Sequence, residues 1–115
     1  MSSHPLDVIF RPSSVAVIGA SSDPRKRGNH AVRALVRGGY RGTVYPVNPG
    51  GGVLYDLPVH RELDELPETP ELALVCTPAE TVPGIVERCG EAGVKAAVVL
   101  AVGFSESDGE GEALE

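Results

Sequence analysis

The stretch at residues 14–28 has the residue types and the order of a phosphate-binding turn. A short apolar run at residues 15–18 breaks at Gly19 into small and polar residues, and a helical pattern starts after Gly28. Strand, small-residue loop and helix in this order bring an anion against backbone N–H groups and the positive end of a helix dipole. The loop adds two hydroxyl donors and three cations, namely Ser21, Ser22, Arg25, Lys26 and Arg27.

Two common phosphate motifs are absent from this loop. The dinucleotide fingerprint G-x-G-x-x-G, read from Gly19, would need glycine where Ser21 and Pro24 stand. No glycine–lysine–serine/threonine follows at the offset of a P-loop. The loop therefore predicts a phosphate site without naming the nucleotide. An ordinary strand-to-helix connection with a solvated basic tip is the alternative.

The other reactive side chains form no catalytic pattern. His4, His30 and His60 have no carboxylate partner that the sequence can place, and the G-x-S-x-G elbow of serine hydrolases does not occur. Cys76 and Cys89 lack metal-ligand spacing and lie in core-like surroundings. This predicts reduced cysteines in a cytoplasmic protein. We expect neither a catalytic residue nor a metal site in this chain.

Charge is distributed unevenly along the 115 residues. The net charge of −6 argues against nucleic-acid binding driven by bulk charge. Seven of the ten lysines and arginines nevertheless lie between Arg11 and Arg41, whereas the second half is acidic. An anionic ligand would find its local attraction in the first half. No apolar run reaches the length of a membrane span, so we expect no membrane partner.

The composition and the hydrophobic pattern favour an α/β fold. Hydrophobic residues make up 42% and aromatic residues 4% of the chain, so the core must consist mainly of Val, Leu, Ala and Ile, which suits parallel strands. Apolar runs predict strands at residues 15–18, 43–47, 72–76 and 96–100. Helical spacing predicts one helix at residues 29–37 and a second that starts near Pro78 and closes at Gly90 or Gly93.

Local signals predict how the two helices begin. Asn29 is expected as the N-cap of the first helix. The segment at residues 77–80, Thr-Pro-Ala-Glu, is typical of a capping box with proline at the first helical position. Pro83 lies further along this helix and predicts a kink or a restart at Thr81.

Three segments outside these elements give weaker patterns. The lead-in at residues 1–13 is expected to tuck apolar side chains against the sheet, namely Leu6, Val8, Ile9 and Phe10. Prolines divide residues 53–70, where we expect a short edge strand near Val59 and one helical turn at residues 62–66. The polar residues 105–115 stop where a helix begins. We therefore expect residues 1–115 to be one domain from the N-terminus of a longer multidomain protein.

Right-handed crossovers would join the elements into a Rossmann-like, doubly wound parallel sheet of about five strands with helices on both faces. Ligands of such folds sit at the carboxyl ends of the strands. The loops at these ends, residues 19–27, 47–51, 76–79 and 100–104, are all rich in small residues. Nicotinamide-binding folds usually carry an acidic residue after the second strand. Asn48 and Pro49 stand there instead, which argues against NAD.

Several short motifs, taken in order and spacing, resemble one known family. They are residues 10–21 (FRPSSVAVIGAS), 28–29 (GN), 45–49 (YPVNP), 77–79 (TPA), 98–100 (VVL) and 103–106 (GFSE). From about residue 8 to 115 the chain is similar to the N-terminal CoA-binding domain of NDP-forming acyl-CoA synthetases. These include ADP-forming acetate–CoA ligase and are related to the α subunit of succinyl-CoA synthetase. The same domain begins bacterial protein acetyltransferases that are fused to a GNAT domain.

The resemblance implies a binding site for coenzyme A. Residues 20–28 and the helix start at Asn29 would hold the diphosphate, while Asn48 and Pro49 would lie near the adenosine. Members often carry a lysine after this asparagine–proline pair, where this chain has Gly50, so Lys26 or a neighbouring arginine would supply that contact. A channel for pantetheine would be lined by Pro78, Ala79, Ala101 and Val102. The full set of expected CoA-binding residues is Gly19, Ala20, Ser21, Ser22, Lys26, Arg27, Gly28, Asn29, Asn48, Pro49, Thr77, Pro78, Ala79, Ala101, Val102 and Gly103.

The resemblance also implies a role in a larger enzyme. The family reaction is acyl-CoA + NDP + phosphate = carboxylic acid + CoA + NTP, in which CoA is a substrate and this domain holds no intrinsic cofactor. The phosphohistidine and ATP-grasp domains that make the acyl phosphate, or a GNAT domain in the acetyltransferases, would be its partners. The alternatives are a stand-alone regulatory CoA-binding protein, an NAD(P)-binding Rossmann module, and a regulatory domain whose loops have lost CoA.

Overall fold

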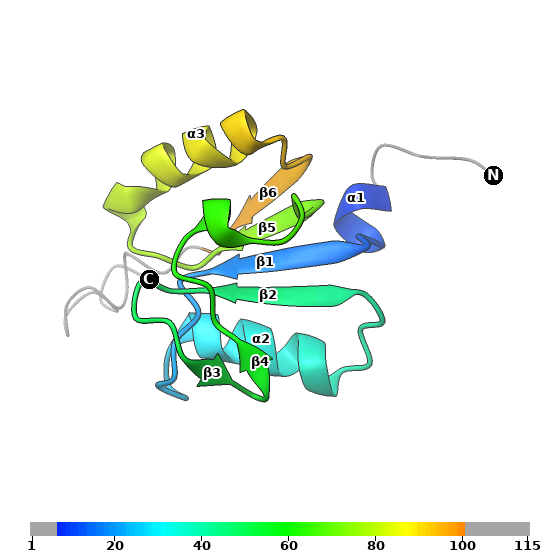
Figure 1. The fold of residues 1–115 in the computed structure, drawn as a ribbon, viewed down its shortest axis with the longest axis vertical. Coiled ribbons are helices and arrows are strands. Elements are labelled where there is room, and N and C mark those ends of the chain that lie inside the picture. Colours follow the sequence, from blue (N-terminus) through cyan, green and yellow to red (C-terminus); the bar gives the residue numbers. More distant parts are fainter. Residues whose placement is uncertain (1–6, 101–115) are drawn as a thin grey trace, which may run out of the picture.

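The computed structural model describes residues 7–100, in which a four-stranded parallel sheet carries one long helix on each face (Figure 1). The helices are α1 (Asp7–Phe10), α2 (Arg27–Arg37) and α3 (Val82–Ala92), with the 3₁₀ turns η1 (Leu63–Glu65) and η2 (Ala79–Thr81). The strands are β1 (Ser14–Ile18), β2 (Thr43–Val47), β3 (Val53–Leu54), β4 (Leu57–Pro58), β5 (Leu72–Val75) and β6 (Ala96–Val99). The four strands of the parallel sheet match the four predicted apolar runs to within one residue at each end.

The sheet has the strand order β2-β1-β5-β6. β2 is therefore added on one side of β1, and the later strands β5 and β6 are added on its other side. β1 pairs in parallel with both β2 and β5, and Val15 lies opposite Val44 on one side and Leu72 on the other. The chain leaves β1 in one direction through α2 and leaves β5 in the other through α3. The predicted Rossmann-like, doubly wound sheet is confirmed, and its switch point lies between β1 and β5.

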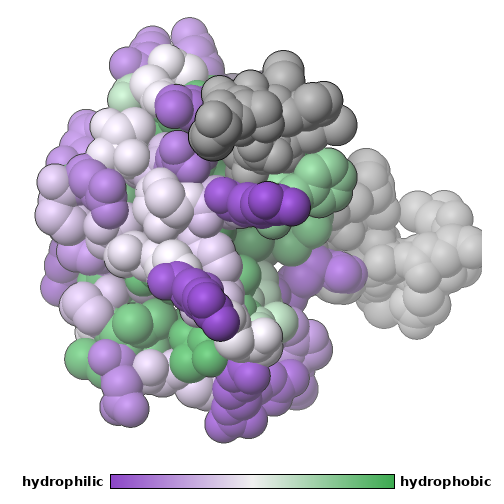
Figure 2. Space-filling model, turned by 90° about the vertical axis from the view of Figure 1, so that its right-hand side faces the viewer, coloured by the Kyte–Doolittle hydropathy of each residue, from purple (hydrophilic) through white to green (hydrophobic). Residues whose placement is uncertain are grey.

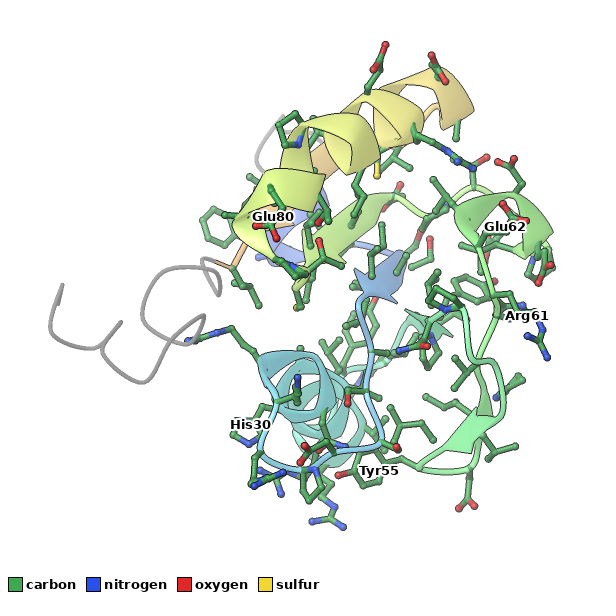
Figure 3. All side chains as sticks on the ribbon, turned by 90° about the vertical axis from the view of Figure 1, so that its left-hand side faces the viewer. His30, Tyr55, Arg61, Glu62 and Glu80 are labelled. Carbon is green, nitrogen blue, oxygen red and sulfur yellow. The ribbon has the colours of Figure 1, made fainter. Side chains whose placement is uncertain are left out.

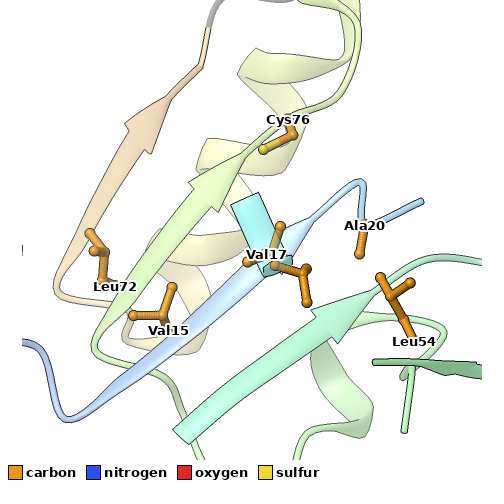
Figure 4. Packing of buried hydrophobic residues seen from close by; sticks show 7 residues of the cluster. Val15, Val17, Ala20, Leu54, Leu72 and Cys76 are labelled. Atoms are coloured by element: carbon orange, nitrogen blue, oxygen red, sulfur yellow. The ribbon is translucent and has the colours of Figure 1, made fainter. Parts of the chain in front are cut away.

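Alternate residues of β1 face opposite layers, because side chains alternate along a strand. One core cluster contains Val15, Val17 and Val32 and includes α2, whereas the other contains Ala16, Ile18 and Cys89 and includes α3. Figure 4 shows Val15 beside Leu72 of β5, Val17 further along β1, and Leu54 near Ala20 at the far end of the cluster. Both faces of β1 are therefore buried, which explains its uninterrupted apolar run.

The expected edge strand near Val59 is reduced to a single contact beyond β2. His60 forms an isolated parallel bridge with Val47, and its N–H donates to the Pro46 carbonyl at 2.9 Å. The residues before it form a separate antiparallel hairpin of β3 and β4, which the sequence did not predict. The helical turn expected at residues 62–66 is present as η1.

The helix starts differ from the prediction at two places. Lys26, in an extended conformation, is the N-cap of α2, so Asn29 lies inside the first turn and the N-cap prediction is wrong. The predicted capping box is also wrong, because Pro78 caps η2 without any side-chain hydrogen bond. The restart at Thr81 is confirmed, since α3 follows η2 directly, and Gly93 ends α3 in a left-handed conformation (φ 92°).

The lead-in does not cover the sheet as predicted. Ile9 is 41% and Phe10 is 72% exposed in the short helix α1, so the prediction is wrong for these two side chains. Leu6 and the Val8 side chain lie outside the described residues. No helix within residues 7–100 is long and apolar enough to cross a membrane.

The amino ends of the strands are fastened by Glu71. Its Oε1 accepts a hydrogen bond from the Ser13 N–H at 2.8 Å, and its Oε2 lies 3.5 Å from Lys95 Nζ. Its own N–H donates to Ser14 Oγ at 3.0 Å. One residue thus links the starts of β1, β5 and β6. Figure 2 views this side of the molecule, where hydrophilic and neutral residues cover most of the coloured surface.

We predict that Glu71→Gln lowers the melting temperature by a few degrees at neutral pH and not in acid. The hydrogen bond from Ser13 and the charge of Lys95 hold the pKa of Glu71 below its ordinary value of 4.5. A carboxylate with a lowered folded-state pKa contributes stability above the unfolded value, and that contribution is lost as the pH falls through the folded pKa. Thermal melts of both proteins between pH 7 and about 3 measure the difference.

Glu87→Gln, on exposed α3, is the matched control and should leave the melting temperature unchanged at both pH values. A Glu71→Gln effect of the same size at both ends of the pH range would contradict this account of the amino edge.

Candidate functional site

The first turn of α2 lies directly against the end of β1, which in turn lies directly against the end of β5. A Cβ added to Gly28 would lie 2.0 Å from the Gly19 carbonyl oxygen, and one added to Gly19 would lie 2.9 Å from the Cys76 carbonyl oxygen. Gly19 also has a φ of +96°, which side chains other than glycine rarely adopt. Both positions therefore require glycine, and their contact brings the amino end of α2 to the carboxyl edge of the sheet.

The first two residues after β1 are tied to β2, so their N–H groups are not free to bind a ligand. The N–H groups of Gly19 and Ala20 both donate to the Val47 carbonyl, at 3.0 and 3.1 Å. The Asn48 Nδ2 donates to the Ala20 carbonyl at 2.5 Å, and its Oδ1 accepts from the Gly50 N–H at 2.7 Å. The Ala20 side chain is in the core. Asn48 thus joins two loops with its side chain.

Asn29 fixes the shape of the loop from inside α2. Its Nδ2 donates to the Ser21 carbonyl at 2.8 Å, and its Oδ1 accepts from the Tyr55 hydroxyl at 2.8 Å. The residue is 2% exposed, so its amide is satisfied within the protein. Tyr55 reaches it from the β3–β4 turn, where Tyr55 and Asp56 adopt positive φ values of 51° and 67°. The hairpin is therefore a support for the loop.

Four amide donors remain open in this loop and helix start. The N–H groups of Ser21, Ser22, Gly28 and Asn29 have no acceptor among residues 7–100. The first N–H groups of any helix lack intrahelical acceptors and carry the positive end of its dipole. Ser21 Oγ accepts from the Asp23 N–H at 3.0 Å, which leaves its hydroxyl proton free to donate. The arrangement can bind an anion.

The three cations of the loop differ in their surroundings. Arg25 pairs with Asp23 at 3.1 Å, and its side-chain hydrogen bond lowers the pKa of that carboxyl to about 2. Lys26, by contrast, is the exposed N-cap of α2. Arg27 lies close enough to Cys76 for its charge to oppose the effect of burial, which raises the pKa of the thiol to about 11. Lys26 and Arg27 are therefore the cations at the open helix end.

Two cavities lie beside the loops that follow β1 and β2. Figure 3 views this carboxyl edge of the sheet nearly end-on. One, of about 310 Å³, is bordered by Ala20, Ser21, Ser22, Asn48 and Gly50 on the hairpin side. The other, of about 220 Å³, is mainly apolar and is bordered by Gly19, Val47, Pro49, Leu63, Thr77 and Ile85. Predicted site residues from three separate loops thus meet around two adjoining hollows.

The loop after β5 closes the far side of this edge. The Cys76 N–H donates to the Ile18 carbonyl at 2.8 Å, and Thr77 borders the apolar cavity. The hydroxyl of Thr81 lies 2.7 Å from Thr77 Oγ1, and Pro78 and Ala79 form the start of η2. Of the remaining predictions, Ala101, Val102 and Gly103 lie outside the described residues.

The histidines and cysteines bring no further chemistry to the edge. His30 Nε2 donates to the Pro24 carbonyl at 2.6 Å and so anchors the loop, while His4 lies outside the described residues. Cys76 and Cys89 are free and buried, as predicted. Within residues 7–100 no group of His, Cys, Asp or Glu could hold a metal ion.

Two residues at the site were missed by the sequence analysis. Tyr55 lies in a two-residue turn between two short apolar pairs, a spacing that signals a hairpin but that lacks the usual glycine or asparagine. Arg61 borders the apolar cavity and donates from Nη1 to the Pro49 carbonyl at 3.0 Å. It stands alone in a proline-divided segment, so no spacing signalled it.

Comparison with known proteins points to one domain family. Residues 13–108 match the family model of the CoA binding domain. The chain is 39% identical over 114 residues to ADP-forming acetate–CoA ligase I subunit alpha from Pyrococcus furiosus, and the match covers 96% of this chain and 25% of the relative. The chain therefore spans about a quarter of the length of this curated relative.

Two solved structures are also similar to this chain in both fold and sequence. The dinucleotide-forming acetyl-coenzyme A synthetase 1 from Ca. Korarchaeum cryptofilum, in complex with phosphate and ADP, matches with a TM-score of 0.80 and 40% identity, covering 91% of this chain and 23% of that one. A conserved hypothetical protein from Pyrococcus furiosus matches with a TM-score of 0.68 and 29% identity, covering 76% of this chain and 73% of that one.

We predict that Tyr55→Phe weakens binding of coenzyme A about fivefold, because a lost hydrogen bond of about 1 kcal/mol loosens Asn29 and the loop it holds. Tyr40→Phe is the matched control, since the Tyr40 hydroxyl donates to the Pro12 carbonyl at 2.6 Å at the opposite edge. Both variants should lose similar thermal stability, whereas calorimetric titration should show weaker binding only for Tyr55→Phe. Equal affinities of the two variants would contradict the supporting role of the hairpin.

Proposed function

The chain belongs to the CoA binding domain family, and from this premise we propose that its carboxyl edge holds CoA with the diphosphate at the amino end of α2. The observation that carries the proposal is the set of four open N–H groups at Ser21, Ser22, Gly28 and Asn29. Gly28 and Asn29 lie in the first turn of an 11-residue helix, and Ser21 and Ser22 lie in the loop before it. The helix dipole favours negative charge at such a helix start. Lys26 and Arg27 add positive charge at the same place.

We place the adenosine end of the ligand in the apolar cavity. It adjoins Gly19 on one side and Pro49 on the other, and Val47, Leu63 and Ile85 give it apolar walls. A planar heteroaromatic ring gains by leaving water for such walls. Asn48 was expected beside the adenosine. Its side chain hydrogen-bonds the loop after β1 and the loop after β2, so we propose that it shapes the adenosine site by holding these loops together.

The pantetheine arm is proposed to leave the diphosphate toward the loop after β5. Thr77, Pro78 and Ala79 follow β5 directly, across the switch point from the loop at residues 20–28. Ligands of doubly wound sheets lie across this point. Ala101, Val102 and Gly103 follow β6 and are proposed as the continuation of this wall.

We propose that the whole protein is an NDP-forming acid–CoA ligase in which this domain binds CoA and presents its thiol to an acyl phosphate. Phosphohistidine and ATP-grasp domains, in the same chain or in a second subunit, would make that acyl phosphate. The ligase subunit from Pyrococcus furiosus, of which this chain spans 25%, supports this setting over a GNAT-fused acetyltransferase. The reaction would be acyl-CoA + NDP + phosphate = carboxylic acid + CoA + NTP, and the free buried cysteines favour a cytoplasmic location.

A stand-alone regulatory CoA-binding protein is the second candidate. One observation favours it, namely the structural match to a conserved hypothetical protein of which this chain covers 73%. A protein of that size cannot also hold the two further domains that a ligase needs. The two candidates share the CoA site and differ in the domains that accompany it.

We predict that the chain binds CoA more tightly than NAD, and that Lys26→Glu weakens CoA binding by about tenfold or more, because the reversed charge faces the diphosphate. Calorimetric titration measures both affinities.

Arg41→Glu makes the same charge change in the turn before β2, at the opposite edge of the sheet, and should alter CoA affinity by less than about twofold. Tighter binding of NAD than of CoA by the unaltered chain would overturn the proposal. Equal losses for Lys26→Glu and Arg41→Glu would reject the placement of the diphosphate.

A further inference from the structure

Arg61 is held in place over the loop that follows β2. Its Nη1 donates to the Pro49 carbonyl at 3.0 Å, and its backbone N–H donates to Glu65 Oε1 at 3.1 Å. The guanidinium lies over Gly51, where an added Cβ would come within 3.3 Å of Arg61 Cζ. A side chain at this position would crowd the guanidinium. The loop is therefore built so that the arginine can lie along it.

Arg61 keeps its charge uncompensated, unlike the other arginine beside the apolar cavity. Arg88 lies 3.5 Å from both Glu62 Oε1 and Asp64 Oδ2, so two carboxylates neutralise it. Arg61 forms no ion pair with any carboxylate in the part of the chain that the structure describes. Its side chain is exposed, and most of its five N–H donors point to no acceptor in residues 7–100. A guanidinium in this state suits a phosphate group.

The position of Arg61 separates it from the cations of the helix start. Arg61, Pro49 and Gly19 all border the apolar cavity, whereas Lys26 lies at the amino end of α2, on the other side of the β1 end. Figure 3 shows Arg61 on the same side as η1 and away from His30 of α2. The edge thus offers two distinct anion positions with an apolar hollow beside them. A ligand that fills both must carry two separated phosphate groups next to an aromatic base.

We propose that Arg61 binds the 3′-phosphate of CoA and thereby selects CoA against nucleotides that lack this group. The inference rests on the proposed function, because it places the diphosphate at α2 and the adenine in the apolar cavity. In CoA the ribose joins these two parts, and its 3′-phosphate then projects toward the loop at residues 48–51. A bidentate guanidinium–phosphate contact is strong and specific. Arg61 is a specificity-determining residue and takes no part in bond making.

The test compares CoA with dephospho-CoA, which lacks only the 3′-phosphate, in calorimetric titrations of the chain and three variants. The unaltered chain should bind CoA at least about tenfold more tightly than dephospho-CoA. Arg61→Gln should weaken CoA binding by about tenfold and change dephospho-CoA binding by less than about twofold. Arg61→Lys keeps the charge without the planar fork and should recover part of the preference. Arg41→Gln, an equal charge loss at the far edge, should leave both affinities unchanged.

The outcomes separate this inference from the proposed function. If the unaltered chain binds both ligands equally well, or if Arg61→Gln weakens both by the same factor, the role of Arg61 is overturned while CoA binding stands. If the unaltered chain binds neither ligand, both proposals fail. Selective loss for CoA in Arg61→Gln supports both.

Discussion

The contact between Gly28 and the Gly19 carbonyl is the constraint on which the rest of the carboxyl edge depends. The helix rests on the strand end so closely that a single added carbon would lie 2.0 Å from that oxygen. This approach directs the first turn of α2 at the edge, and the loop between the two glycines must then fold outward over a short span. Asn29 and Asn48 hold the loop in that shape through the Ser21 and Ala20 carbonyls. The open amide donors are a consequence of this geometry.

The strand order brings the loop constrained by this contact together with the neighbouring loops at one edge of the sheet. Because β1 lies between β2 and β5, the loops after all three strands border one another at the switch point. The division of β1 between two core clusters places α2 behind one side of the edge and α3 behind the other. The open N–H groups near the helix start and an apolar hollow near η1 therefore adjoin across the end of one strand. That pairing suits a ligand that joins a charged group to an aromatic base.

Much of the fold could be predicted from the sequence, because β1, β2 and β5 are apolar runs bounded by glycine or proline. The parallel sheet, the restart at Thr81 and the small-residue loop after β1 all follow from such local signals. The β3–β4 hairpin could not be predicted, since its turn residues Tyr55 and Asp56 adopt positive φ values without glycine. The prediction of Asn29 as an N-cap is wrong, because its side-chain amide accepts a hydrogen bond from Tyr55, 26 positions away. Arg61 could not be placed at the site from the sequence, because only the tertiary fold brings it beside the loop after β2.

The most direct measurement of the central claim is an NMR titration of the ¹⁵N-labelled chain with CoA. The account predicts that the amide resonances of Ser21, Ser22, Gly28 and Asn29 move together and saturate, because their N–H groups gain an anionic acceptor. The amides of Gly19 and Ala20 already donate to the Val47 carbonyl and should move less. Saturable shifts confined to other segments, such as the amino ends of the strands, would contradict the claim that this helix start is where CoA binds.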